Sequence, residues 1–199
     1  MNERLPIRLE TLSGAAIAEV VPDLARLRVE VFRDWPYLYD GDADYERRYL
    51  AKYAAMDDAT IVVARNGARV VGASTALPLA RAEAAMQAPF RGAGLDPHDW
   101  YYFGESVLER GWRGHGIGVA FFARREARAA ALGYRRTTFC AVERPADHPL
   151  RPPDHVPLDA FWTRRGYVRR PELRASFDWL DIGQSQETAH PMVFWTRDL

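Results

Sequence analysis

A short glycine-rich segment near the middle of the chain constrains the fold more than any other feature. Residues 113–118 have the sequence RGHGIG and lie between a strand-like run at 100–108 and an amphipathic run at 117–132. Glycine lets the backbone turn tightly, and the first amides of a helix have no partner within the helix. Together with the helix dipole, this arrangement is typical of a site that binds a diphosphate. The alternative is a glycine-rich turn that only starts the helix.

The spacing of these glycines excludes two familiar nucleotide-binding loops. A dinucleotide-binding fold requires G-x-G-x-x-G and an acidic residue farther along the chain. A P-loop requires Gly-Lys followed by Ser or Thr at its end. Residues 113–118 match neither pattern, so neither of these folds is predicted.

The hydrophobic pattern predicts strands and helices that alternate along the chain. A hairpin is expected at 60–64 and 68–76, because the Asn66-Gly67 pair between them tolerates positive φ. Other strands are expected at 7–12, 100–108, 135–142, 176–182 and 191–196, and helices at 17–32, 45–53, 81–87, 117–132 and 158–165. Residues 90–99 and the proline-rich segment 143–157 are expected to be irregular. This order predicts an α/β protein with a mixed sheet covered by helices.

Length and charge narrow the class of protein. The chain has 199 residues, which suits one domain spanning 1–199. Its formal net charge is zero, so no nucleic-acid partner is expected. No apolar run reaches the roughly 18 residues of a membrane span, and the first residues lack the apolar core of a signal peptide. We therefore expect a cytoplasmic location and no membrane partner.

The cysteine and histidine content argues against an intrachain disulfide and against a metal site. The chain has a single cysteine, Cys140, so an intrachain disulfide cannot form. The five histidines lack the paired spacing of metal ligands, so no metal is expected.

Two segments resemble motifs of the GNAT superfamily of acyltransferases. Residues 113–118 resemble its acyl-CoA motif, R/Q-x-x-G-x-G/A, with Arg113, Gly116 and Gly118 at the defined positions. Residues 161–167, with the sequence FWTRRGY, resemble its aromatic-pair helix, and residues 32–41 are similar to a bacterial subgroup of about this length. The resemblance, which covers 7–199, implies a mixed, mostly antiparallel sheet of about seven strands. Its fourth and fifth strands, at 100–108 and 135–142, would splay apart to admit the pantetheine arm.

The resemblance also implies an enzyme, an acyl-CoA-dependent N-acetyltransferase. It would move an acetyl group from acetyl-CoA, as cosubstrate, to a primary amine of a small molecule or peptide by direct attack in a ternary complex. Backbone groups near the end of the fourth strand would bind pantetheine, and amides of the glycine segment would bind the pyrophosphate. The implied acyl-CoA-binding residues are Val107, Leu108, Arg110, Arg113, Gly114, His115, Gly116, Ile117, Gly118 and Trp162. The expected partner is the amine acceptor, with a homodimer as a further alternative.

Acyl transfer to an amine needs a base, and two carboxylates are candidates. Glu105 lies on the strand before the glycine segment, and Glu143 follows the next strand. Many family members place the base nine or eleven residues before the motif arginine, which corresponds here to Gly104 and Tyr102. Simple alternation would send Glu105 to the other face of the sheet unless a bulge intervenes. The alternative for each carboxylate is a surface or salt-bridged role.

The family often uses a tyrosine to protonate the leaving thiolate, and this chain has Trp162 at that position. An indole N–H donates a hydrogen bond but does not pass on its proton. Either the thiolate leaves without such help, or Tyr37, Tyr39 or another group acts as the acid. The family usually binds the acceptor between the first two helices, which is where Tyr37, Tyr39, Asp40 and Asp42 lie. Aromatic rings and carboxylates suit a cationic amine, so Tyr37, Tyr39 and Asp40 are candidate acceptor-binding residues, with His148 near the second base candidate. The alternative for the aromatic segment is a hydrophobic plug.

Two other functions on the same scaffold stay open. The unusual Trp162 and the uncertain base are compatible with a non-catalytic acyl-CoA-binding or sensor protein. A third alternative is an interaction module with a vestigial pocket, which would not bind coenzyme A.

Overall fold

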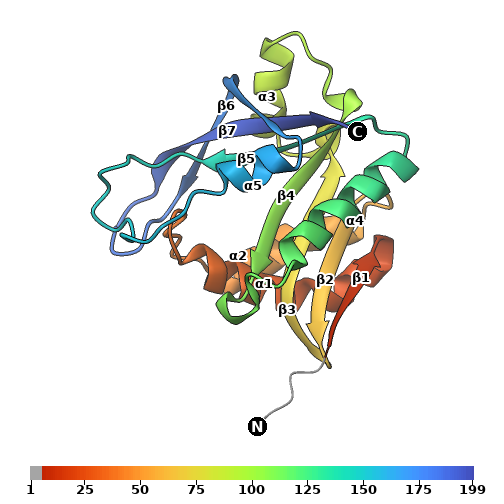
Figure 1. The fold of residues 1–199 in the computed structure, drawn as a ribbon, viewed down its shortest axis with the longest axis horizontal. Helices are drawn as coiled ribbons and strands as arrows, with labels where there is room; N and C mark the ends of the chain where they lie inside the picture. Colours follow the sequence, from red (N-terminus) through yellow and green to blue (C-terminus); the bar gives the residue numbers. More distant parts are fainter. Residues whose placement is uncertain (1–5) are drawn as a thin grey trace.

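The computed structural model describes residues 6–199, which form a seven-stranded sheet flanked by helices (Figure 1). The strand order is β1-β2-β3-β4-β5-β7-β6. The strands are β1 (Ile7–Leu12), β2 (Thr60–Asn66), β3 (Arg69–Pro78), β4 (Trp100–Leu108), β5 (Arg136–Val142), β6 (Val168–Trp179) and β7 (Thr188–Asp198). The α-helices are α1 (Val21–Phe32), α2 (Ala43–Ala54), α3 (Ala84–Gly92), α4 (Ile117–Ala131) and α5 (Asp159–Arg164). All neighbouring strands pair antiparallel except β4 and β5, which confirms the predicted mixed sheet.

Helices cover both faces of the sheet, and each face has its own apolar core. On one face, Leu24 of α1 and Leu50 of α2 pack with Tyr102 of β4. On the other face, Phe122 of α4 packs with Phe103 of β4 in a separate cluster. α1, α2 and α4 therefore each bury one apolar stripe against the sheet, as amphipathic helices do. Across residues 6–199, no helix is both long and apolar enough to cross a bilayer.

The two central strands separate along their length, as predicted. β4 and β5 pair only over three positions, from Trp100 opposite Arg136 to Tyr102 opposite Thr138. Beyond these positions β5 continues to pair with β7 as far as Val142, while β4 continues beside β3. The sheet therefore opens between β4 and β5 on the side toward which both strands run (Figure 1).

Several predicted elements have different bounds in the structure. The helix predicted at 17–32 is a 3-10 helix (Gly14–Val20) followed by α1, and β7 extends beyond the predicted 191–196 at both ends. Two further differences have a tertiary cause. The expected helix at 81–87 is instead α3, which extends into the predicted loop because Phe90 is buried against Trp100 and Phe194, with ring centroids 5.2 and 5.1 Å away. The strand expected at 176–182 begins at Val168 and ends earlier. Pro171 is tolerated there because it lies in a register shift between β6 and β7, where its missing N–H removes no regular ladder bond.

Candidate active site

Residues from several parts of the chain line one cavity where β4 and β5 separate. Its volume is about 840 Å³. The walls come from the aromatic segment after α1, from β4, from the start of α4, from the loop after β5, and from α5. The residues predicted from the sequence that line it are Tyr37, Glu105, Leu108, Arg113, Gly114, Gly116, Gly118, Glu143 and Trp162. The fold thus brings most of the predicted catalytic and loop residues to one place.

The glycine loop forms one wall of the cavity at the beginning of α4. Gly114 and Gly116 have φ values of 81° and 78°, a left-handed conformation that favours glycine. Gly116 is the N-cap residue of α4, and no side chain within residues 6–199 caps the helix. The first amides of α4 are therefore available to an anion, and the helix dipole favours negative charge there. This geometry suits the diphosphate of coenzyme A.

A β-bulge in β4 decides which way the first base candidate points. The register between β3 and β4 shifts so that Thr75 lies opposite both Gly104 and Glu105. An extra residue of this kind interrupts the alternation of side chains along a strand. As a result, Tyr102, Glu105 and Val107 all face α1 and α2. The bulge is why Glu105 shares a face with Tyr102, against the simple alternation considered from the sequence.

Glu105 belongs to a buried charge cluster with Arg28 of α1 and Glu46 of α2. Arg28 Nη1 is 2.6 Å from Glu105 Oε2, and Arg28 Nε contacts Glu46. Burial lowers the pKa of Arg28, but its attraction to Glu105 and Glu46 outweighs that effect, and the net shift is upward. The second carboxylate oxygen of Glu105, Oε1, is buried and has no hydrogen-bond partner in the described part of the chain. That oxygen belongs to a side chain that lines the cavity.

The hydroxyl and thiol groups around Glu105 are held in their neutral forms. Burial raises the pKa of Tyr37, Tyr49 and Tyr53 above the ordinary value of a tyrosine. Burial also raises the pKa of the Cys140 thiol to about 11. Near neutral pH these groups can donate hydrogen bonds but do not act as anionic bases. Among the described tyrosines, Tyr37 alone lines the cavity.

Glu143, the second base candidate, is held by two cations at the end of β5. Its carboxylate forms ion pairs with Arg169 and Arg174 of β6. Both carboxylate oxygens are engaged, one by each guanidinium. Neither oxygen of Glu143 is thus left without a partner, whereas Oε1 of Glu105 has none in the described part of the chain. The geometry therefore favours Glu105 over Glu143 as the base.

Arg144 connects the proline-rich loop (143–157) to the aromatic segment at residues 32–41. Its guanidinium donates to the backbone oxygens of Pro36 and Tyr37, over 2.9 and 2.7 Å. It also pairs with both carboxylate oxygens of Asp181, at 2.7 Å each. Trp179 Nε1 donates to the same carboxylate and to the Tyr37 carbonyl. This network fixes the wall that carries Tyr37.

Several predicted acyl-CoA residues lie beside the cavity and do not line it. Val107 and Ile117 are buried in the cores on opposite faces of the sheet. His115 is exposed within the glycine loop, and the Arg110 side chain is 81% exposed and lies 3.5 Å from Asp34. For these four residues, contact with an acyl-CoA would involve backbone groups or movement of an exposed side chain.

Of the predicted acceptor-binding residues, the fold places only some at the cavity. Tyr37 lines the cavity, but Tyr39 and Asp40 do not, and Asp40 pairs with Arg33 at 2.7 Å on the surface. His148 packs its ring against Trp35, with centroids 5.1 Å apart, and Trp35 lines the cavity. Trp35 was not singled out from the sequence, although it lies in the aromatic segment that was.

Two buried arginines at the site were also missed by sequence reasoning. Arg28 lies four residues after Leu24 on the buried face of α1, and Arg125 lies four residues after Phe121 on that of α4. A charged residue at helical spacing within an apolar stripe is a signal that could have identified both. Their partners could not have been deduced in the same way, because those lie on distant strands and helices.

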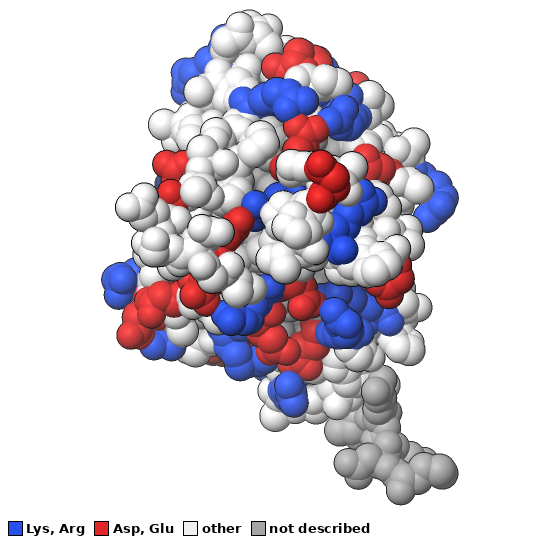
Figure 2. All heavy atoms as spheres, turned by 90° about the vertical axis from the view of Figure 1, so that its left-hand side faces the viewer, with Lys and Arg blue, Asp and Glu red and all other residues white. Residues whose placement is uncertain are grey.

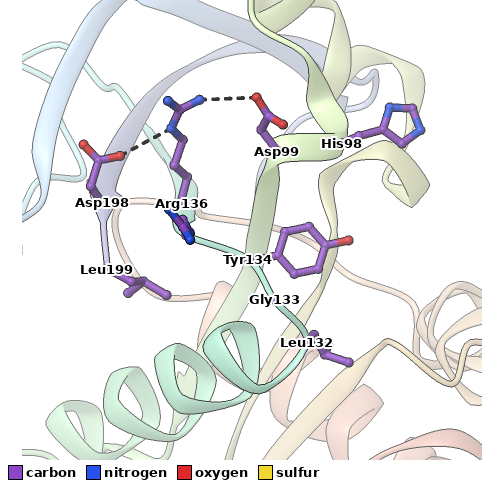
Figure 3. Close-up of a pocket in the computed structure, with 9 residues that line it drawn as sticks. His98, Asp99, Leu132, Gly133, Tyr134, Arg136, Asp198 and Leu199 are labelled. Carbon is purple, nitrogen blue, oxygen red and sulfur yellow. Dashed lines mark hydrogen bonds and ion pairs between the residues drawn. The ribbon is translucent and has the colours of Figure 1, made fainter.

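A second pocket lies at the opposite end of β4 and β5 and contains none of the predicted residues. It has a volume of about 640 Å³ and is lined by residues that include His98, Tyr134 and Arg136. Arg136 already pairs with Asp99 and Asp198, at 3.3 and 3.5 Å (Figure 3). Among the described residues that line this pocket, none has a buried side-chain nitrogen or oxygen without a hydrogen-bond partner.

Neither positive nor negative charge dominates the face that carries β6 and the proline-rich loop (143–157). Figure 2 shows acidic and basic side chains intermixed there. Within residues 6–199, no three His, Cys, Asp or Glu side chains cluster so that they could hold a metal ion.

Comparison with known proteins places the fold. No protein-family model matches the sequence. No curated protein matches it either. Ribosomal-protein-alanine N-acetyltransferase from Brucella melitensis superposes with a TM-score of 0.61 at 15% identity, over 98% of this chain and 100% of that one. An acetyltransferase of the GNAT family from Streptococcus pneumoniae gives 0.59 at 12%, over 98% and 100%.

A third solved structure contains a ligand of interest. A Salmonella typhimurium protein assigned as an acetyltransferase was solved with its cofactor acetyl-CoA. It superposes with a TM-score of 0.56 at 13% identity, over 97% of this chain and 94% of that one. Similarity at these identities shows a shared fold.

Proposed function

We propose that this chain, which has the GNAT fold, is an acetyl-CoA-dependent N-acetyltransferase acting on a primary amine of a small molecule or peptide. Two features of the site support the proposal. The strands β4 and β5 part beside an uncapped helix start, which suits a donor with a diphosphate and a long arm. The observation that carries the catalytic assignment is the buried, unpartnered Oε1 of Glu105 on the cavity wall.

In this proposal the glycine loop and the opened strands hold the donor. The first amides of α4 and those of Gly114 and Gly116 bind the diphosphate, while backbone groups of β4 near Leu108 bind the pantetheine arm. Trp162 of α5 forms an apolar wall, supported by Phe139 and Trp195 with ring centroids 5.1 Å away in both cases. The donor supplies a thioester carbonyl as the electrophile.

The acceptor reaches the donor from the side of α1 and α2. The Arg28 guanidinium and the carboxylates of Glu46 and Glu105 carry a net charge of −1 when all three are ionised, which attracts an ammonium group. Trp35 and Tyr37 offer aromatic faces to the same cation. The neighbouring His148 supports Trp35 from behind.

Glu105 then acts as the general base. It accepts a proton from the bound ammonium, and the free amine then forms a C–N bond to the thioester carbon. The nitrogen gives its second proton to solvent, and the C–S bond breaks to release the coenzyme A thiolate. Tyr37, neutral and on the cavity wall, donates the proton that converts this thiolate to the thiol, and it regains a proton from solvent. Trp162 cannot supply that proton, because an indole N–H is not a proton donor to a thiolate.

Release of coenzyme A thiol from acetyl-CoA with a panel of amines tests the proposal. Removal of a general base costs roughly 10²- to 10⁴-fold in rate, so Glu105→Gln is expected to lose kcat by this range while acetyl-CoA still binds. Glu143→Gln is the matched control at a paired carboxylate of the same cavity, and a loss below about tenfold is expected.

Two outcomes would contradict the proposal. Turnover that survives Glu105→Gln removes the base assignment. Tight acetyl-CoA binding with no turnover of any amine would favour the non-catalytic sensor instead.

A further inference from the structure

Arg125 of α4 is a buried cation without a carboxylate partner. The residue is 1% exposed, and none of the carboxylates in residues 6–199 forms an ion pair with it. The rings of Phe103 and Phe122 lie on its guanidinium, with centroids 4.3 and 4.9 Å from Cζ. Burial lowers the pKa of Arg125 to about 10, so the side chain stays protonated at neutral pH. A desolvated charge is costly, and Arg125 is one of the residues that line the cavity, so its retention there calls for a role.

Arg125 Nε donates to the Phe121 carbonyl within α4 over 3.3 Å, and its two terminal nitrogens donate to oxygens at the β4 bulge. Nη1 donates to the carbonyls of Thr75 and Glu105, each over 3.2 Å. Nη2 donates to Ser106 Oγ over 2.9 Å. Thr75 of β3 and Glu105 of β4 lie where the register shifts, and Ser106 comes next along β4. The guanidinium therefore links both strands at the bulge.

The same bulge has two further requirements. The Glu105 N–H donates to Thr75 Oγ1 over 3.2 Å, so a side chain replaces the regular ladder partner. A Cβ at position 104 would lie 2.5 Å from Thr75 Oγ1, so Gly104 is needed for this approach. In a regular antiparallel pair the backbone groups would be hydrogen-bonded by the partner strand alone. At the bulge, Arg125 and Thr75 supply hydrogen-bond partners instead, and Gly104 leaves room for the close approach of the two strands.

Loss of this support has a specific consequence for Glu105. If the strand relaxes to regular pairing, every side chain beyond the shift moves to the other face of the sheet. Glu105 would then leave Arg28 and turn toward α4, away from the acceptor side. The position of the carboxylate thus depends on a guanidinium on the other side of the sheet.

We propose that Arg125 is a positioning residue, which fixes the β4 bulge and thereby holds the Glu105 carboxylate at Arg28 on the acceptor side of the cavity. The kinetic consequence of this inference, a loss of kcat when Arg125 is replaced, rests on the proposed function. Its structural consequence, the location of Glu105, stands independently of any turnover.

The kinetic test compares Arg125→Met with Arg125→Lys. Misplacement of a reacting group by about 1 Å costs on the order of a hundredfold, so Arg125→Met is expected to lose kcat by about that factor. Coenzyme A affinity, measured by calorimetry, should change by less than about threefold, because the glycine loop lies two turns away on α4. Arg125→Lys keeps the charge and donors to the same carbonyls, so it should recover much of kcat.

A double variant separates positioning from a general loss of structure. If Arg125 acts through Glu105, adding Arg125→Met to Glu105→Gln should cost less than about threefold more than Glu105→Gln alone. Thr75→Val removes the other support of the bulge and should be non-additive with Arg125→Met in the same way. Full additivity in both cycles would overturn the positioning role.

The structural test needs no activity. A crystal structure of Arg125→Met should show the Glu105 carboxylate displaced from Arg28, with regular pairing or disorder around position 104. If the variant is poorly folded, Thr75→Val provides the same test from the other strand. A variant structure with an intact bulge and an unchanged Glu105–Arg28 pair would overturn the inference. An inactive wild-type protein would instead contradict the proposed function and leave this structural test to decide about Arg125.

Discussion

Arg28 Nη1 lies 2.6 Å from Glu105 Oε2, and this ion pair joins α1 to the bulged part of β4. Both side chains are mostly buried, at 13% and 6% exposure. The guanidinium is shared with Glu46, so one cation serves two carboxylates from separate elements. The proposed base is therefore positioned from both faces of the sheet, by Arg28 on one and by Arg125 on the other.

Removal of Arg28 is expected to destabilise the protein strongly. Arg28→Met leaves Glu46 and Glu105 buried without a cation, and removal of one partner from a buried pair typically costs about 3–5 kcal/mol. Urea unfolding followed by circular dichroism measures the change. Arg47→Gln is the control, because the Arg47–Asp44 pair is exposed and should contribute less than about 1 kcal/mol. Equal effects of the two variants would show that the buried cluster is not a special source of stability.

The conformation of Gly116 should matter for binding of the donor. Its φ of 78° is strained for a residue with a Cβ, so Gly116→Ala should shift the first amides of α4. We expect coenzyme A affinity to fall roughly tenfold, about 1.4 kcal/mol, in calorimetry. Gly94→Ala is the matched control, because Gly94 has a φ of 72°, equally open surroundings and no place on the cavity wall. Unchanged affinity in Gly116→Ala would argue that these amides do not bind the donor.

Loss of Arg144 should affect the acceptor more than the donor. Arg144→Met frees the carbonyls of Pro36 and Tyr37 and leaves Asp181 without its bidentate partner. The wall that carries Tyr37 should then become mobile, and the KM for the amine should rise roughly tenfold because binding must order it. The KM for acetyl-CoA should stay within about twofold. A rise in both KM values by the same factor would contradict the division of the cavity into two sides.

The free energy of unfolding is expected to fall in mildly acidic solution because of the buried His190. Burial lowers the pKa of His190, and repulsion from Arg144 adds to that shift. The unfolded state titrates near the ordinary value of about 6.5, so below that pH it binds a proton that the native state does not yet bind. Stability is therefore retained above about pH 6.5 and is lost as the pH falls through the lower native pKa.

Unfolding free energies at about pH 7 and pH 5 test this in the wild type and in His190→Gln. The decrease between the two conditions should be smaller in the variant, by up to about 1.4 kcal/mol for each pH unit in which only the unfolded state is protonated. His98→Gln, at an exposed histidine, should leave the wild-type decrease unchanged. An equal decrease in wild type and His190→Gln would show that other groups account for it.

Sequence reasoning was most successful where the signal is local. The glycines at 114 and 116, the amphipathic pattern of α4 and the Asn66-Gly67 turn each depend on neighbouring residues, and all three elements are present. The bounds of α3 and β6 were wrong because they depend on burial of Phe90 and on a register shift at Pro171. Such contacts join residues that are far apart in the sequence.

By itself, the sequence predicted the order of strands and helices and the glycine turn at the beginning of α4, and its resemblance to the GNAT superfamily implied which strands separate. Only the tertiary structure decided the face on which Glu105 lies, because a single extra residue opposite Thr75 reverses that face. It also brought Arg28, Glu46 and Arg125 to the site from three helices. Periodicity along one strand carries no information about its register with the next, and that register is set by partners such as the Arg125 guanidinium.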